Sequence, residues 1–250
     1  MDFGTVKGLT ASYDLRRTKN VRLRASYTLQ FTNATGASTT TMSALIAAGV
    51  PNLRSTFAMP WDRRHQFNVT LDYRFADGKD YNGPVSRREN SGKKPIQWLA
   101  NTGVALTMQG GSGTPYTAQS NVNSPISAGT NLLKGSYYGS RLPWAFRFDL
   151  RVDKDINLKL GKKEKEDRRS AYLNVYLQVL NVLNSKNIVG VYSSTGNPDD
   201  DGYLSAPEWQ REIANQTNPD SYYELYSLFV NNFYNYSSPR QIRVGVSFNF

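Results

Sequence analysis

The chain has 250 residues, a formal net charge of +10, one His and no Cys. The absence of Cys excludes disulfides, thiolate metal sites and cysteine nucleophiles, and a single His65 makes a catalytic dyad or a multi-His metal centre unexpected. No run approaches the roughly 18 apolar residues of a membrane-spanning helix. The start of the chain lacks the basic and then apolar pattern of a secretory signal. The 16 Tyr and 19 Gly, together with many Asn, Ser and Thr, point to β-structure with polar loops.

Hydrophobic periodicity predicts long β-strands. Between Asn20 and Thr32 the residues alternate strictly, with Leu23 and Phe31 on the apolar face and Arg24 on the polar one. The same period of two returns along the chain, most weakly before Met108. The alternating segments are 8–15, 20–32, 66–75, 98–108, 146–160, 172–179 and 241–250.

The length and charge of these segments favour a membrane environment. At about 3.3 Å per residue Phe146–Leu160 would be about 50 Å long, enough to cross a bilayer when tilted by about 45°. Its polar row is too highly charged for a packed interior and suits a water-filled lumen. That row contains Arg147, Asp149, Arg151, Asp153 and Asp155. The alternative is a large soluble sheet with one solvated face.

The connections between the segments alternate between short and long. Residues 17–19 and 161–169 are short, whereas 33–63, 110–143 and 193–239 are long, like the external loops of outer-membrane barrels; 76–95 departs from the pattern. We predict an all-β fold in which residues 1–250 form the C-terminal seven or so strands of one larger transmembrane antiparallel β-barrel domain, with one external loop partly helical. Because lipid does not tolerate open strand edges, we expect N-terminal strands from the same protein or a partner to complete it.

Six short motifs carry a family resemblance through their order along the chain. They are Pro51–Arg54 (PNLR), Trp61–Asn68 (WDRRHQFN), Leu71–Phe75 (LDYRF), Gly78–Pro84 (GKDYNGP), Gly111–Tyr116 (GSGTPY) and Leu180–Asn187 (LNVLNSKN). Together they resemble the C-terminal third of Bacteroidota TonB-dependent outer-membrane receptors, the group that includes SusC-like and Oar-like transporters. The resemblance implies a barrel of about 22 strands around an N-terminal plug, importing large nutrients of the glycan, peptide or chelated-metal class.

The same resemblance implies the partners and the location of the chain. The partners are the remaining strands and plug of the receptor, the TonB complex acting through that plug, outer-membrane lipid and a surface lipoprotein. The location is the outer membrane of a Gram-negative cell. Neither a plug nor a TonB-contacting segment is recognisable in residues 1–250, so transport would belong to the whole receptor.

The last eight residues look like the signal read by the barrel-assembly machinery. A polar residue, a Gly two places later and two hydrophobic residues ending on an aromatic form this pattern, which is carried by Arg243, Gly245, Phe248 and Phe250. Aromatic residues also mark the expected membrane interfaces. These are Tyr13, Phe31, Phe75, Trp144, Phe146, Phe248 and Phe250.

Residues 197–208 fit the calcium loop of an EF-hand. Oxygen ligands, a turn-forming Gly and a final Glu have the required spacing, with Asn in place of the usual first Asp. The predicted ligands are Asn197, Asp199, Asp201, the Tyr203 carbonyl, Ser205 and Glu208. In a second interpretation, compatible with the first, Ser205 and Glu208 form a capping box for a helix through Trp209–Ile213.

Other features are less specific. The aromatic residues of 222–236 could form a helix that packs on the barrel mouth, or could stack on sugar or peptide ligands. The sequence assigns no ligand-binding residue and contains no catalytic constellation, so an enzyme is not expected. Basic residues are spread rather than gathered into a nucleic-acid interface. A secreted soluble carbohydrate-binding β-domain remains the alternative function.

Overall fold

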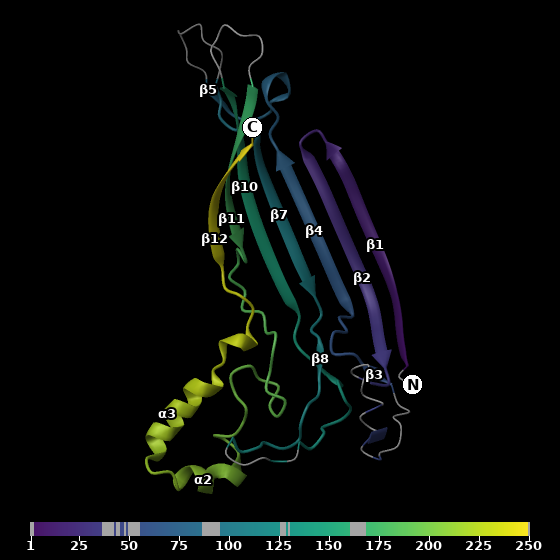
Figure 1. Ribbon diagram of the computed structural model, residues 1–250, viewed down its shortest axis with the longest axis vertical. Helices are drawn as coiled ribbons and strands as arrows, with labels where there is room; N and C mark the ends of the chain where they lie inside the picture. Colours follow the sequence, from purple (N-terminus) through teal and green to yellow (C-terminus); the bar gives the residue numbers. More distant parts are fainter. Residues whose placement is uncertain are drawn as a thin grey trace.

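The computed structural model describes residues 3–36, 43, 46–47, 49, 56–86, 96–125, 129, 131–160 and 169–249. Its main feature is a large antiparallel sheet of seven long strands in the order β1-β2-β4-β7-β10-β11-β12 (Figure 1). The long strands are β1 (Gly4–Thr18), β2 (Val21–Ala34), β4 (His65–Arg74), β7 (Thr102–Gly111), β10 (Ala145–Leu160), β11 (Arg169–Leu180) and β12 (Gln241–Asn249). The seven strands expected from periodicity are therefore confirmed.

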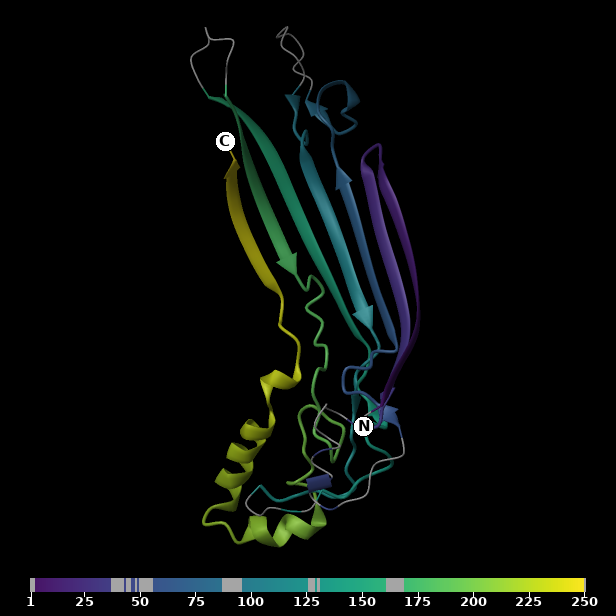
Figure 2. The same cartoon turned by 45° about the vertical axis from the view of Figure 1, so that its right-hand side comes forward.

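Short strands and helices lie at the two ends of this sheet. The short strands are β3 (Phe57–Ala58), β5 (Val85–Ser86), β6 (Ile96–Gln97), β8 (Pro115–Tyr116) and β9 (Ser140–Arg141). The helices are η1 (Gly78–Asp80), η2 (Pro207–Trp209), α2 (Gln210–Ala214), α3 (Pro219–Val230) and η3 (Phe233–Asn235). Both views place α2 and α3 at the end of the sheet where β1 begins, which we call the loop end (Figures 1 and 2).

Each long strand pairs with the long strand before and after it in the chain, and every pairing is antiparallel. The sheet is open: within the described residues β1 and β12 are its two edges, and no closed barrel is formed. No helix in the described part of the chain is long and apolar enough to cross a membrane.

The register aligns the apolar rows of all seven strands on one face. One cross-strand row connects Leu15, Leu23, Leu71, Leu106, Leu150, Val179 and Ile242 through direct pairings. Since successive side chains of a strand point to opposite faces, this single alignment puts the charged rows together on the other face. We call these two surfaces the apolar face and the polar face.

The strands are also staggered. Relative to the row just described, β1 extends 11 residues toward the loop end, from Leu15 to Gly4, whereas β12 extends only one, from Ile242 to Gln241. A shift of ten residues is about 33 Å along the strands and occurs over six strand spacings of about 4.8 Å. The line through the loop-side ends of the strands is therefore oblique to the strands. Relative to an axis perpendicular to that line, the strands are tilted by about 45–50°. This is close to the tilt of roughly 35–45° found in barrels.

One strand boundary expected from the sequence is wrong. The alternation suggested a strand from Trp98 to Met108, but β7 begins at Thr102. Residues before it form a turn in which Asn101 has φ of 58° and the Thr102 N–H donates to the Leu99 carbonyl, 3.0 Å away. An Asn tolerates this left-handed conformation better than most residues, so the turn overrides the weak alternation.

The long loops are partly outside the described residues. The loop expected at 33–63 includes β3, and that expected at 110–143 includes β8 and β9; 193–239 contains the helices, which confirms a partly helical loop. Helix α3 begins where Asn218 accepts a hydrogen bond from the Ser221 N–H at 3.1 Å and Pro219 occupies the first turn.

A cluster of buried hydrophobic side chains lies in this helical region rather than on the sheet. Tyr203, Ile213, Tyr226 and Val230 form it, and Tyr203 is completely buried. The helical region is thus held by its own small core.

Candidate functional site

The apolar face of the sheet is exposed to its surroundings. Val244 is 74% exposed, Leu9 67% and Val246 64%, and the described residues place nothing over them. A contiguous exposed apolar surface of this kind marks an interaction with protein or membrane rather than with water.

Aromatic side chains gather where the apolar face meets the loop end. The Tyr27 hydroxyl lies 2.8 Å from His65 Nδ1, His65 stacks on Trp144 with ring centroids 5.4 Å apart, and Trp144 stacks on Phe146 at 6.0 Å. His65 therefore belongs to an aromatic cluster at the rim of the sheet, and its backbone N–H donates to the Ser112 hydroxyl at 3.1 Å. The expected interfacial residues Phe31, Trp144 and Phe146 lie at this end.

The opposite end of the apolar face contains a second aromatic group. Tyr73 and Phe75 meet edge to face at 4.9 Å, and Phe248 pairs with Leu173 on β11. Lys154, the one cation in the apolar row of β10, donates from its ammonium to the Trp98 carbonyl. Its charge is thus satisfied by a backbone carbonyl of the turn that precedes β7.

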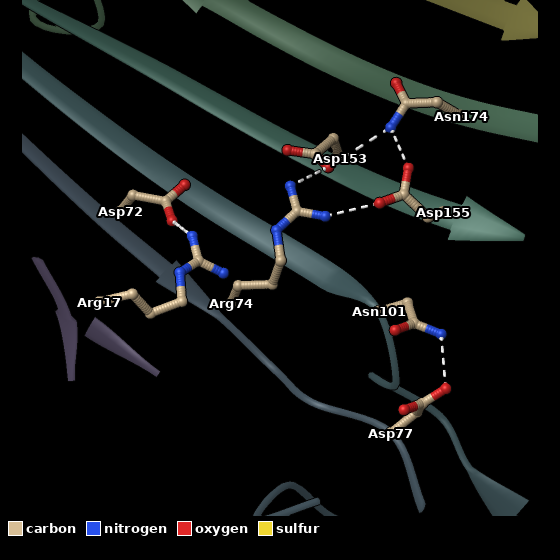
Figure 3. A network of polar contacts seen from close by, with 8 residues as sticks. All are labelled: Arg17, Asp72, Arg74, Asp77, Asn101, Asp153, Asp155 and Asn174. Atoms are coloured by element: carbon tan, nitrogen blue, oxygen red, sulfur yellow. Dashed lines mark hydrogen bonds and ion pairs between the residues drawn. The ribbon is translucent and has the colours of Figure 1, made fainter. Parts of the chain in front are cut away.

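The polar face contains a network of charges, shown in Figure 3. The guanidinium of Arg74 on β4 donates to Asp153 and to Asp155 on β10, both at 2.6 Å, across the intervening strand β7. Asn174 on β11 donates to Asp155 at 2.6 Å, which extends the network by one more strand. Gly103 makes the crossing possible, because a Cβ there would lie 2.7 Å from an Arg74 nitrogen.

Charged residues on the polar face connect several strands, although no hydrophobic core lies on that face. Arg17 pairs with Asp72 near the β1–β2 hairpin, and Arg147 lies 3.0 Å from Asp149 at the loop-end half of β10. Ion pairs of this exposure contribute little each to stability. Their arrangement instead gives the polar face a hydrated surface with charges of both signs.

The C-terminal residues predicted as an assembly signal divide between the two faces. Arg243 pairs with Gln178 and Gly245 with Tyr176, whereas Phe248 shares the apolar face; Phe250 lies outside the described residues. A Gly is required at position 245 for a local reason, because a Cβ there would lie 2.4 Å from Tyr176 Cζ. The Tyr176 ring therefore lies over Gly245 and accepts the Arg151 guanidinium at 4.3 Å from its centroid.

A buried ion pair ties the loops together at the rim of the sheet. Asp62 is 1% exposed, accepts from the Thr32 N–H at 2.8 Å and pairs with Arg141. Arg141 also donates to the Asp62 carbonyl at 2.8 Å and to the Gly113 carbonyl at 3.3 Å. The guanidinium of Arg141 on β9 thus connects the segment before β4 with the segment between β7 and β8, and Asp62 links both to β2.

The acidic loop 197–208 folds through hydrogen bonds to its own backbone. Asn197, Asp200 and Asp201 each accept the N–H two residues ahead, at 3.0, 2.8 and 3.0 Å. Gly202 has φ of 86°, which confirms the sharp turn expected at the Gly of the calcium motif.

Four of the side chains predicted as calcium ligands form hydrogen bonds within the protein. Among the described residues no three or more His, Cys, Asp or Glu side chains could hold a metal ion together. The second oxygen of Asp201 accepts from the Tyr226 hydroxyl at 2.5 Å, and Asp199 accepts from the Tyr236 hydroxyl. Ser205 donates to the Gly202 carbonyl at 3.2 Å, and Glu208 is exposed on η2. Calcium therefore stays a prediction from the sequence.

The capping box expected from Ser205 and Glu208 is wrong. The helical stretch begins with η2, whose N-cap residue Ala206 has no side-chain hydrogen bond, and Pro207 occupies its first turn. Because Ser205 is used inside the acidic loop, it does not cap the helix. The helix expected through Trp209–Ile213 is present as η2 and α2.

Tyrosine–carboxylate bonds attach the acidic loop to the helices. Besides the Asp199–Tyr236 and Asp201–Tyr226 bonds, the Tyr203 hydroxyl donates to Glu212 at 2.7 Å. Burial, strengthened by these neighbours, raises the pKa of Tyr203 and of Tyr226 above the ordinary value of 10.0. The hydrogen bond to Asp199 is the main cause that raises the pKa of Tyr236. All three hydroxyls are therefore protonated donors at neutral pH.

A cavity of about 760 Å³ opens beside these bonds at the loop end of β11 and β12. Its aromatic wall comes from the segment after α3, where the Phe233 and Tyr234 rings lie 4.0 Å apart and are 72% and 74% exposed. The lining residues are Asn184, Ser185, Lys186, Asp199, Asn231, Phe233, Tyr234, Tyr236, Ser237, Ser238 and Pro239.

A smaller cavity of about 200 Å³ lies over the loop-end part of the sheet. Gln66, Asn68, Gln109 and Arg147 of the polar rows are among the residues that line it. Ser237 lines both cavities, and its buried Oγ has no hydrogen-bond partner in the described structure. The two cavities are therefore neighbours, and Ser237 borders both.

Comparison with known proteins gives no match. No family model, no curated protein and no solved structure is similar to this chain. The family resemblance of the short motifs thus stays a prediction, and function is argued from the geometry above.

The cavity is the part of this region that the sequence did not predict. Its walls come from residues 184–186, from Asp199 and from residues 231–239, and nothing in the spacing of these segments shows that they meet. The available signal was compositional, since Asn, Ser and aromatic residues are concentrated in 231–239. From the sequence alone, the aromatic residues there predict only loop packing or stacking on a ligand.

Proposed function

We propose that this chain is a membrane-spanning part of a TonB-dependent outer-membrane receptor that imports large nutrients. The observation that carries the proposal is the register of the seven strands, which gathers every apolar row on one exposed face and the charged rows on the other. Hydrocarbon on one side and water on the other satisfy both faces at once.

Strand length and stagger support the same conclusion. The 16 residues of β10 are about 50 Å long, far beyond the 5–6 residues usual in globular proteins. The progressive shift of the strand ends corresponds to the tilt that a closed barrel requires. Aromatic residues at both ends of the apolar face suit the two interfaces of a bilayer.

The open edges define the partners. Along β1 and β12 the outward backbone N–H and C=O groups have no strand partner among the described residues, and each such group costs several kcal/mol in hydrocarbon. In this proposal the remaining strands of the same receptor pair with both edges and enclose a plug, through which the TonB complex acts. The loop end faces the cell exterior, where a surface lipoprotein can bind. The chain is not an enzyme and does not bind nucleic acid.

Calcium in the acidic loop is a separate proposal that rests on the motif. Binding would require Asp199 and Asp201 to exchange their tyrosine partners for the ion, since both now accept phenolic hydroxyls. Calorimetry with millimolar calcium should give heat of binding that Asp201→Ala removes. No heat for the unaltered protein would contradict the proposal.

Fluorescence quenching by brominated phospholipids tests the membrane assignment. The chain has four Trp, of which Trp61, Trp98 and Trp144 are 59%, 60% and 49% exposed. Trp209 instead packs on Tyr203 in the helical region and donates to the Val122 carbonyl. Variants that each retain one Trp are reconstituted into vesicles as part of the complete polypeptide. We expect lipid to quench Trp98 and Trp144 strongly and Trp209 weakly.

The opposite outcome would be clear. If the protein is recovered soluble without detergent and brominated lipid quenches none of the four Trp, the apolar face meets something other than hydrocarbon. Water-soluble acrylamide serves as the matched control, because it should quench the exposed Trp61 of the loop end more strongly than Trp98 and Trp144 when these two lie in lipid.

A further inference from the structure

The smaller cavity, of about 200 Å³, is built by the register of three strands on the polar face. Two neighbouring cross-strand rows of β4, β7 and β10 line it, each connected by direct pairings. The rows are Asn68, Gln109 and Arg147, and then, toward the loop end, Gln66, Gly111 and Ala145. Because the Gly has no side chain and the Ala only a methyl group, the second row leaves a space beside the first.

Hydrogen-bond donors surround this space. In addition to the amides of the two rows, the guanidinium of Arg63 lines it from the segment before β4, and none of the described lining residues is Asp or Glu. Arg63 is exposed and has no ion-pair partner in the described part of the chain. The amides of Gln66 and Asn68 likewise make no side-chain hydrogen bond there. The cavity therefore has several donors that the protein itself does not use.

Arg147 is held in place by two neighbours. Its Nε donates to Asp149 at 3.1 Å, and its Nη2 donates to Gln109 at 3.0 Å. Among the described residues Nη1 has no partner, so it remains a free donor. Because a guanidinium carries its donors in a rigid planar fork, the two bonds also fix the direction of the remaining N–H groups. Asp149 offsets one charge, which leaves two guanidiniums against one carboxylate.

The polar face separates its charges along the strands. Toward the β1–β2 hairpin, Arg17 and Arg74 are both paired with carboxylates. Closer to the loop end, Arg151 lies over an aromatic ring and Arg243 donates to an amide, and neither has a carboxylate partner among the described residues. The surroundings of the cavity are therefore positive, and such a surface concentrates anions from solution.

We propose that the smaller cavity binds an oxyanion group of a ligand, a phosphate or a carboxylate, between the guanidiniums of Arg63 and Arg147. Guanidiniums form their strongest hydrogen bonds with groups of this kind. The cavity is smaller than the roughly 300–1,000 Å³ of pockets that enclose a whole small molecule, so it holds one charged group. The inference goes beyond the proposed function, because the site lies on the hydrated face and does not depend on a membrane.

The test titrates the complete polypeptide in detergent with inorganic phosphate and, separately, with acetate. Low ionic strength is used, because salt screens exposed charges. Calorimetry gives the stoichiometry and the dissociation constant. We expect at least one of the two anions to bind at a single site, and Arg63→Gln and Arg147→Gln each to weaken binding by at least about fivefold. Binding of phosphate alone would assign a phosphate group, and binding of acetate alone a carboxylate.

Arg64→Gln is the matched control. Arg64 is the next residue in the chain and loses the same charge, but its guanidinium lies over the Phe31 ring, 5.6 Å from the centroid, and does not line the cavity. This variant should therefore bind the anion as tightly as the unaltered protein. Because Arg63 is exposed, Arg63→Gln should leave the urea midpoint unchanged, which verifies the fold.

Three outcomes would overturn the inference. These are binding of neither anion by the folded protein, equal losses of affinity in Arg64→Gln and in Arg63→Gln, and binding of the cation choline as tightly as of the anions. Each is independent of the membrane assignment, because a protein recovered soluble without detergent would have the same cavity. Conversely, a lipid-embedded protein that binds neither anion would leave the proposed function standing and remove only this inference.

Discussion

Placing a charge on the apolar face gives a direct measure of what that face contacts. Leu106 is the fifth of the ten residues of β7, which is the central strand of the seven, and it lies between Leu71 and Leu150 in the aligned row. Ten residues are about 33 Å long, or about 23 Å along the membrane normal at a tilt of 45°. Leu106 is then within a few Å of the bilayer midplane.

At that depth Arg destabilises a barrel by about 2–4 kcal/mol. We therefore expect Leu106→Arg to lower the free energy of unfolding by this amount in the complete polypeptide in phosphatidylcholine vesicles, measured by urea denaturation. Thr107→Arg is the matched control. Thr107 is the next residue but lies on the polar face between Thr70 and Asp149, where a cation meets water and a carboxylate. Its effect should stay within about 0.5 kcal/mol.

The comparison of the two variants is decisive because they differ by one position and carry the same new side chain. Equal effects, or a Leu106→Arg protein as stable as the unaltered one, would refute the assignment of the apolar face to hydrocarbon. A soluble sheet with that face in water would give this result, since an Arg on a solvated surface has little effect on stability.

Three further predictions concern the sheet, the rim and the helical region. Gly245→Ala should lower the free energy of unfolding by about 1–3 kcal/mol, because its methyl group would lie 2.4 Å from Tyr176 Cζ. Adding Tyr176→Ala should recover part of this loss. Urea denaturation measures both variants, and an unchanged free energy of unfolding for Gly245→Ala would contradict the packing. Replacing the buried Asp62 by Ala should lower the free energy of unfolding by about 2–4 kcal/mol, since a guanidinium and a backbone N–H lose their acceptor. A loss below about 1 kcal/mol in urea denaturation would show that water replaces the Asp62 carboxylate as the acceptor. The raised pKa values of Tyr203 and Tyr226 mean that their contribution to stability is complete below pH 10.0 and is lost as pH rises above it. Tyrosinate absorbance and near-ultraviolet circular dichroism should therefore change together in that alkaline range. Ionisation of these two residues without loss of the dichroism would contradict their burial.

The sheet could be predicted from the sequence because its signal is local. Alternation within one strand already separates the two faces. A short turn between β1 and β2 was expected at residues 17–19, and the structure has it slightly later, at Lys19 and Asn20, because β1 continues through Thr18. Register followed from the same pattern, since a slip by one residue would bring charged side chains to the apolar face. The error at Trp98 arose where the alternation was weakest.

The loop end could not be predicted in the same way, because its contacts join residues far apart in the chain. The pair of Asp62 with Arg141 spans 79 positions, and Tyr236 reaches Asp199 across 37. No periodicity encodes such pairings. The calcium motif predicted the turn at Gly202 correctly, but the tyrosines that bind its carboxylates lie later in the chain, in α3 and just after η3.

The nearest-neighbour pairing of the strands has an evolutionary consequence. Because the backbone of every long strand pairs only with that of its predecessor and successor, a hairpin is the smallest piece that can be duplicated or lost without changing the antiparallel order of the rest. Gain of two strands at either edge would preserve which loops share a side, whereas gain of one would send all later connections to the opposite side. Genes encoding such sheets are therefore expected to lengthen in paired steps.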